Sequence, residues 1–159
     1  MAVLAGALVA LIAIADTRAR VAAAVEALAV PGPWRESRWS WDLFPADPSV
    51  YAHLSFAVGV PTTRFAAAGE SVRHKRGADG GLVESDLSVR WTYRMRADRQ
   101  VGDYDAALGA EAALIVALGG VPLTDMHLWI VEMRRELTGD GAWMLGDVRC
   151  IVRHRIAVQ

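Results

Sequence analysis

Two stretches of the chain alternate apolar and polar side chains with the period of a β-strand. They cover residues 51–60 (YAHLSFAVGV) and residues 87–96 (LSVRWTYRMR). Because successive side chains of a strand point to opposite faces of a sheet, this alternation predicts two strands that each bury one face. The apolar positions of the second strand are Leu87, Val89, Trp91, Tyr93 and Met95. Its other face carries three arginines, Arg90, Arg94 and Arg96.

The last third of the chain predicts a long hairpin. Residues 126–137 and residues 143–158 both have strand character, and they flank the sequence TGDG at 138–141. Asp-Gly between two apolar runs is a strong signal for a tight hairpin turn. In the second of these strands the positions expected to share one face are Val148, Cys150, Val152, His154 and Ile156.

Two alanine-rich stretches predict helices. The first covers residues 2–29 and should end at Pro-Gly-Pro, residues 31–33, because proline cannot continue a helix. The second should run from about Tyr104 to Leu118, with Asp103 as its N-cap and two glycines ending it. Glu111 is the only charged residue between Ala106 and Leu118. We therefore expect the sheet, the first helix or another subunit to cover this helix on most sides.

The first fifteen residues, MAVLAGALVALIAIA, are almost entirely apolar. The run is shorter than the roughly 18–20 residues that a membrane-spanning helix needs. No basic residue precedes it, as one would in a secretory signal. We expect a packed terminal helix here, with a membrane or signal segment as the alternative.

Residues 34–44 are unusually rich in aromatic side chains, with Trp34, Trp39, Trp41 and Phe44. Aromatic residues at this density favour an ordered loop or a short edge strand that serves as a hydrophobic plug or a subunit contact. A platform on which sugars or bases stack is the alternative. Residues 61–82 are polar and rich in glycine, and they predict a long mobile loop between two antiparallel strands.

The order of elements is helix, strand, long loop, strand, helix, strand, strand. It predicts a single α+β domain over residues 1–159. An antiparallel or mixed sheet of about four main strands would pack against two helices, with a long hairpin loop. A chain of this length can bury a sizeable core without metals or disulfides.

Charge and catalytic motifs limit the classes of function. The chain has 17 basic and 18 acidic residues, which argues against bulk electrostatic binding of nucleic acid. It has no nucleophile elbow, phosphate-binding glycine loop or dinucleotide fingerprint, and its four histidines lie far apart. Cys150 is the only cysteine, and its apolar surroundings in the sequence predict a buried structural thiol. We expect no enzymatic activity, no metal and no cofactor.

Two basic features remain as candidate contact sites. Arg73, Lys75 and Arg76 lie in the predicted long loop and would touch phosphates or an acidic partner, or form a solvated tip. The arginine face of the 87–96 strand would extend across the sheet through Arg149, Arg153 and Arg155 if the two strands are neighbours. Arginine pairs well with carboxylates, and the acidic segments 84–86 and 103–105 are the expected partners. We favour ion pairs within the chain or between subunits over contacts with DNA.

Three segments together resemble a known family. They are LSVRWTYRMRADRQVGDYDAALGAEAALIVAL (87–118), DTRARVAAAVEAL (16–28) and HLSFAVGV (53–60). In order and spacing they resemble the tail-terminator proteins of long-tailed bacteriophages and gene-transfer particles. The resemblance covers most of the chain and rests on pattern, since this family has no catalytic signature. The Trp-rich segment and the apolar N-terminus depart from the pattern.

The resemblance implies a structural virion protein of the tail or neck, assembled in the host cytoplasm. Its copies would form a hexameric ring that caps the tail tube, ends tube polymerisation and joins the head–tail connector. DNA would pass through the lumen without specific recognition, and no membrane would be involved. We expect subunit or tube contacts at Arg73, Lys75, Arg76, Arg90, Arg94, Arg96, Trp39 and Trp41. Another head–tail connector or tail-tube component is the alternative, and a small ligand- or sugar-binding α+β module is the second.

Overall fold

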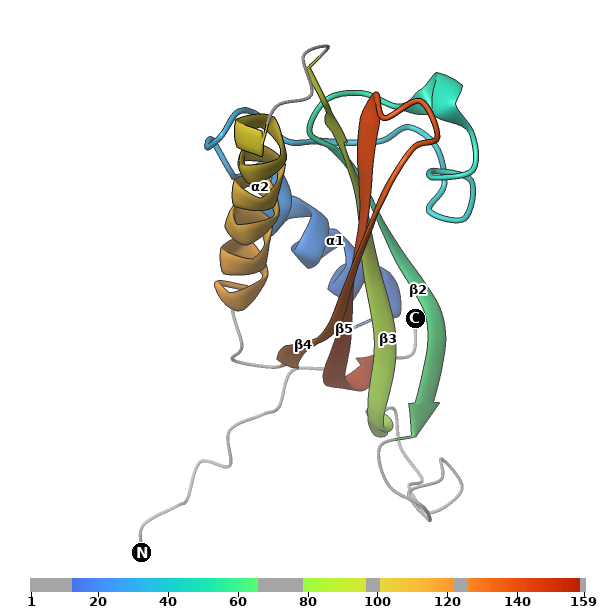
Figure 1. Cartoon of the computed structure of the whole chain (residues 1–159). Helices are drawn as coiled ribbons and strands as arrows, with labels where there is room; N and C mark the ends of the chain where they lie inside the picture. Colours follow the sequence, from blue (N-terminus) through green and yellow to red (C-terminus); the bar gives the residue numbers. More distant parts are fainter. Residues whose placement is uncertain (1–12, 66–78, 97–100, 122–125, 158–159) are drawn as a thin grey trace, which may run out of the picture.

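The computed structural model describes residues 13–65, 79–96, 101–121 and 126–157 (Figure 1). The helices are α1 (Ile14–Glu26) and α2 (Val101–Gly119), with a single 3-10 turn, η1, at Pro48–Val50. The strands are β1 (Arg35–Glu36), β2 (Ser55–Phe65), β3 (Asp79–Arg94), β4 (Met126–Leu137) and β5 (Trp143–Ala157).

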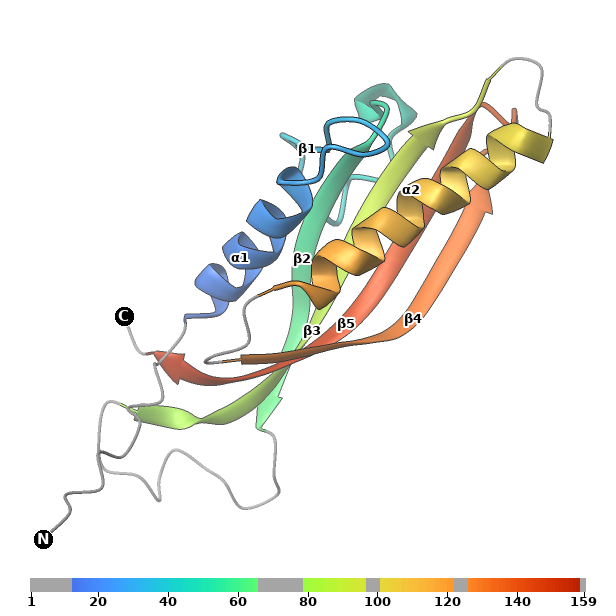
Figure 2. The same cartoon turned by 90° about the vertical axis from the view of Figure 1, so that its left-hand side faces the viewer.

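The five strands form one mixed sheet in the order β1-β2-β3-β5-β4. The short β1 runs parallel to β2, and all other neighbours are antiparallel. Both helices lie on the same side of the sheet (Figure 2). The predicted α+β fold is therefore confirmed, and β1 adds a fifth strand to the predicted four.

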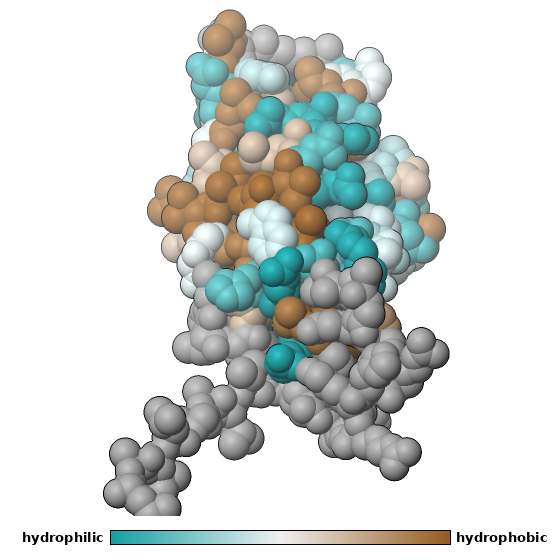
Figure 3. Space-filling model, turned by 90° about the horizontal axis from the view of Figure 1, so that it is seen from below, coloured by the Kyte–Doolittle hydropathy of each residue, from teal (hydrophilic) through white to brown (hydrophobic). Residues whose placement is uncertain are grey.

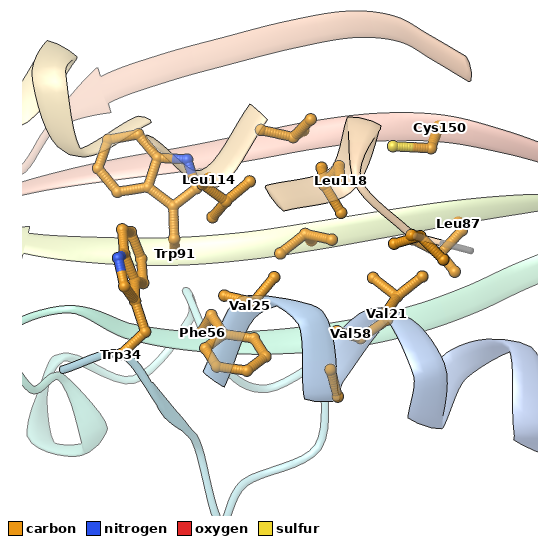
Figure 4. Packing of buried hydrophobic residues seen from close by; sticks show 14 of the residues in the cluster. Val21, Val25, Trp34, Phe56, Val58, Leu87, Trp91, Leu114, Leu118 and Cys150 are labelled. Carbon is orange, nitrogen blue, oxygen red and sulfur yellow. The ribbon is translucent and has the colours of Figure 1, made fainter. Parts of the chain in front are cut away.

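The core lies between the helices and the sheet face that they cover, which we call the helix face. Alternate residues of the strands supply the sheet side of this core, as their period of two requires. The buried strand residues include Phe56, Val58, Leu87, Val89, Trp91, Val148, Cys150 and Val152. The helices contribute Val21 and Val25 from α1 and Leu114 and Leu118 from α2 (Figure 4). The predicted apolar faces of β3 and β5 are thus confirmed.

Trp91 occupies the centre of this core and is fully buried. Its ring meets Trp34 edge to face, with centroids 6.4 Å apart and an interplanar angle of 77°. On β5, Gly146 is the register partner of Trp91, and a Cβ added at Gly146 would overlap the indole ring. The close approach of the ring to the β5 backbone therefore requires glycine at position 146.

The aromatic segment joins the two sides of the sheet at its β1–β2 edge. Trp34 packs into the core on the helix face, and β1 then pairs with the start of β2. Trp41 lies on the opposite face, where its ring covers Gly59 so closely that a Cβ there would overlap it. The predicted ordered loop with a short edge strand is confirmed.

Helix α1 begins later than the sequence predicts. Ala13 has an extended backbone (φ −66°, ψ 148°), and the first helical residue is Ile14. The N-terminal part of the predicted helix, residues 1–12, lies outside the described residues. Within the described residues, no helix is long and apolar enough to cross a membrane.

Two other predicted boundaries are wrong. Helix α2 starts at Val101, so Asp103 lies within its first turn instead of capping it. The strands also extend into the predicted 61–82 loop, because β2 continues to Phe65 and β3 begins at Asp79. The rest of that loop, residues 66–78, lies outside the described residues.

The contact between Trp91 and Gly146 gives a stability prediction. We expect Gly146→Ala to lower the free energy of unfolding by about 1–3 kcal/mol, since the added methyl group forces a rigid indole out of a packed core. Gly139→Ala is the matched control, because a Cβ at Gly139 meets no atom within 4 Å. Urea unfolding followed by tryptophan fluorescence measures both changes. Equal midpoints for the two variants would contradict the role of Gly146.

Candidate interaction surfaces

The sheet face opposite the helices, which we call the outer face, carries the arginines singled out in the sequence. On β3 this face consists of Glu84, Asp86, Ser88, Arg90, Thr92 and Arg94, and on β5 of Asp147, Arg149, Ile151, Arg153 and Arg155. The register places Arg90 opposite Asp147 and Glu84 opposite Arg153. Positive and negative side chains therefore meet across neighbouring strands, as stable cross-strand pairs do.

Arg90 is held by partners from two other segments of its own chain. Its guanidinium lies 4.0 Å from the centroid of the Trp41 ring, and Nη1 donates a hydrogen bond to the Trp41 carbonyl at 3.0 Å. Its Nε lies 3.9 Å from Oδ2 of Asp147. The Ser88 hydroxyl donates to the same carboxylate. Arg90 thus joins the aromatic segment to β3 and β5.

Arg94 and Arg96 have different surroundings from Arg90. The Arg94 guanidinium carbon lies 6.0 Å from the ring centroid of Trp143. The side chain of Arg96 is 81% exposed, and its Nε lies 3.9 Å from the Asp103 carboxylate, which also accepts a hydrogen bond from the Arg96 backbone N–H. The three arginines therefore do not form a row of equivalent phosphate-binding groups.

The acidic segment 84–86 does pair with arginines, although not with those of β3. Arg64 of β2 reaches Asp86 at 3.1 Å and Glu84 at 3.5 Å, and Arg153 of β5 also binds Glu84. The hydrogen bond from Arg153 holds the pKa of Glu84 below its ordinary value. Ion pairs thus link β2, β3 and β5 across the outer face.

The same pattern continues to the sheet edge. Arg149 of β5 binds Glu132 of β4 at 3.2 Å, and Arg134 binds the same carboxylate at 2.8 Å. Arg149 and Arg153 thus form the expected ion pairs, and they form them within a single chain. Surface pairs of this kind contribute little stability individually, but in the described part of this face they neutralise Arg64, Arg149 and Arg153.

The predicted contact residues fall into three groups. Arg90 and Trp41 bind each other, whereas Arg94, Arg96 and Trp39 are exposed. Arg73, Lys75 and Arg76 lie outside the described residues. The three tryptophans share no surface, because Trp34 is buried in the core and Trp41 covers Gly59 on the outer face. They therefore do not form one stacking platform.

Within the described residues, helix α2 is covered only on its inner side. The sequence led us to expect cover on most sides by the sheet, the first helix or another subunit. In the single chain Val101, Tyr104 and Val116 point outward, and Val116 is 73% exposed. Nothing within the described residues covers this outward side. Figure 3 shows apolar residues gathered on the half of the molecule that carries the helices. Exposed apolar surface of this kind is typical of sites that contact other chain segments.

Strand β4 presents a second uncovered apolar surface. It is the last strand of the sheet and pairs only with β5, so one row of its backbone N–H and C=O groups has no partner strand. Its large exposed apolar residues are Trp129, Val131, Met133 and Leu137. A long edge strand with exposed apolar side chains is a ready site for pairing with another chain.

An ion pair that was not predicted from the sequence joins α2 to β4. Glu111 is 2% exposed, its Oε2 accepts a hydrogen bond from Nε of Arg135, and the same oxygen forms an ion pair with Nη2. Removing Arg135 would leave the buried Glu111 carboxylate without its cation, so the pair fixes the position of β4 relative to the helix. The signal was present in the sequence, because Glu111 is the lone charge in an apolar helix.

One polar pocket lies beside the end of β3. A pocket of about 770 Å³ is lined by His53, Tyr93, Arg94 and Asp103 among others. His53 Nδ1 accepts a hydrogen bond from the Arg94 backbone N–H at 3.2 Å, and burial lowers the pKa of His53. The described residues contain no group of three or more histidine, cysteine or acidic side chains that would hold a metal.

No protein-family model matches this chain, and no curated protein matches it. The assignment of function therefore rests on the residues and surfaces described above.

We expect Arg90→Ala to lower the free energy of unfolding by about 1–2 kcal/mol, because it removes a partly buried cation–π contact and leaves Asp147 without its arginine. Arg94→Ala is the matched control, since the Arg94 side chain is exposed and its guanidinium lies farther from the nearest aromatic ring, that of Trp143. Thermal unfolding of both variants measures the difference. A loss as large for Arg94→Ala would show that position on the outer face, and not the Trp41 contact, determines the effect.

The Cys150 thiol should be inert in the folded protein. It is buried, and burial raises its pKa to about 12, so the reactive thiolate is scarce at pH 8. We expect no labelling by iodoacetamide at pH 8 and complete labelling in concentrated urea, measured by intact mass. Rapid labelling of the native protein would contradict the described position of the side chain.

Proposed function

We propose that this protein is a ring-forming structural subunit of a phage-like tail, and specifically a tail terminator. The observation that supports the proposal most is the contrast between its two kinds of surface. Most charged side chains of the outer face are ion-paired, namely Glu84, Asp86, Arg90, Asp147, Arg149 and Arg153, whereas α2 and the β4 edge expose apolar side chains. Such a chain is suited to packing against other chains.

A closed ring needs two different surfaces on each subunit, because the contact between neighbours is heterologous. The outward side of α2 and the edge of β4 are two such surfaces on one chain. Glu111 and Arg135 hold them in a fixed relation. Arg94, Arg96 and Trp39 are exposed, and we propose that they contact a neighbouring subunit or the tail tube. Arg73, Lys75 and Arg76 stay candidates on the grounds of sequence alone.

The near-neutral charge supports the proposed passage of DNA through the lumen. Proteins that hold DNA do so through unpaired lysine and arginine side chains that bind phosphates. Here the net charge is −1, and Arg64, Arg149 and Arg153 each pair with a carboxylate. A ring built from such subunits would let DNA slide without retaining it.

Two alternatives use the same features differently. A head–tail connector or tail-tube subunit would also assemble through exposed apolar surfaces, so deletion of the gene is needed to distinguish these parts. Overlong tails indicate a terminator, whereas heads without tails or missing tubes indicate one of the others. A sugar-binding module is less well supported, because Trp34, Trp39 and Trp41 do not share a surface.

Assembly of the purified protein tests the proposal. We expect mass photometry to show a ring, with six copies as the stoichiometry implied by the resemblance. The double variant Met133→Glu and Leu137→Glu should abolish the ring with little change in melting temperature, since both side chains are exposed on β4. Val30→Glu, at another exposed apolar position, is the matched control and should assemble normally.

A strict monomer at all concentrations, together with absence of the protein from assembled tails, would contradict the proposal. Rings that persist in the Met133→Glu and Leu137→Glu variant would exclude β4 as an interface while leaving ring formation itself intact.

A further inference from the structure

Helices α1 and α2 leave an apolar groove between them. The groove measures about 710 Å³ and lies between the C-terminal half of α1 and the end of α2. Its lining residues are Arg20, Ala23, Ala24, Ala27, Leu28, Ala117 and Gly120. Arg20 alone among them carries a charge, so the walls of the groove match a ligand with aliphatic side chains.

The α2 side of this groove continues into a fully apolar surface. Residues 112–121 contain no charged or polar side chain, and Val116 is exposed to solvent. Apolar surface left in water is unfavourable roughly in proportion to its area. A segment that fills the groove would remove part of this surface from water.

The chain carries a segment of matching chemistry next to α1. Residues 1–12, MAVLAGALVALI, have no charged side chain and no side chain that forms strong hydrogen bonds. They join α1 at Ala13, whose extended backbone directs the chain away from the helix axis.

The segment is long enough to reach the whole groove. The stretch of α1 and its following turn from Ile14 to Leu28 spans about 21 Å, at the helical rise of 1.5 Å per residue. Twelve extended residues span up to about 40 Å. Because the segment is covalently attached, its effective concentration at the groove is on the order of millimolar, which favours it over a second copy in dilute solution.

We propose that residues 1–12 turn back along α1 and fill the α1–α2 groove of their own chain with apolar side chains. The inference does not depend on the function proposed above. It gives the apolar N-terminus an intramolecular binding site and accounts for the uncovered apolar walls of the groove.

Cross-linking of the full-length chain tests this placement. The double variant Leu8→Cys and Ala24→Cys places one thiol in the segment and one in the groove. Cys150 does not compete for the cross-linker, because it is buried. With a short bismaleimide at low micromolar protein, we expect mainly an intrachain product. The matched control, Leu8→Cys with Gly139→Cys, places the second thiol in the exposed β4–β5 turn and should give almost none.

Two results would overturn the proposal. Equal yields for the pair and its control would show that the segment has no preferred site. Mainly interchain dimers from the Leu8 and Ala24 pair would show that the groove takes the segment of a second copy.

A second measurement does not depend on cross-linker geometry. The double variant Leu4→Asp and Leu8→Asp makes burial of the segment unfavourable, so it should leave the groove open. We expect binding of the hydrophobic dye ANS to rise several-fold, while far-UV circular dichroism of the described core is retained. Val30→Asp, at an exposed position outside the groove, is the control. Unchanged ANS binding in the folded double variant would overturn the proposal.

Discussion

The alternation of β3 is the constraint on which the rest of this fold depends. β3 lies between β2 and β5, so its side chains determine what both faces of the sheet can contact. Its period of two sends Trp91 into the core and Arg90 to the outer face. A slip of one residue would exchange these faces and place arginines in the core. The glycine at 146 adds to this constraint, since only one register brings it beneath the Trp91 ring.

Trp91 and Arg90, which this alternation sends to opposite faces of the sheet, both contact the aromatic segment, residues 34–44. On the helix face Trp91 contacts Trp34, and on the outer face Arg90 contacts Trp41. The chain between the two tryptophans therefore passes around the β1–β2 edge and is attached on both sides. Tryptophans that resemble a ligand platform in the sequence serve here to attach this segment to both faces of the sheet, where β1 pairs with the first two residues of β2.

Local patterns predicted the elements and their buried faces, because the period of a strand or helix is a property of neighbouring residues. The contact partners of a side chain and the ends of a helix or strand depend instead on residues distant in the chain. Arg90 meets Asp147 only through the β3–β5 register, which neither strand reveals alone. Asp103 has the sequence of a cap, but it binds the Arg96 backbone because β3 ends beside α2. Alanine favours helix on both sides of Ala13, so propensity did not locate the start of α1.

Helix α2 shows how a single chain can leave part of an apolar helix exposed. Such a helix is stable when one side packs on a sheet, and the Glu111–Arg135 ion pair fixes α2 beside the edge strand. The outward side is then available for other contacts. Because most charged side chains described on the outer face are paired within the chain, the gain from burying surface against a partner is greatest at α2 and β4, where apolar side chains are exposed to water. The distribution of paired charges and exposed apolar surface therefore supports the proposal that this chain assembles with others.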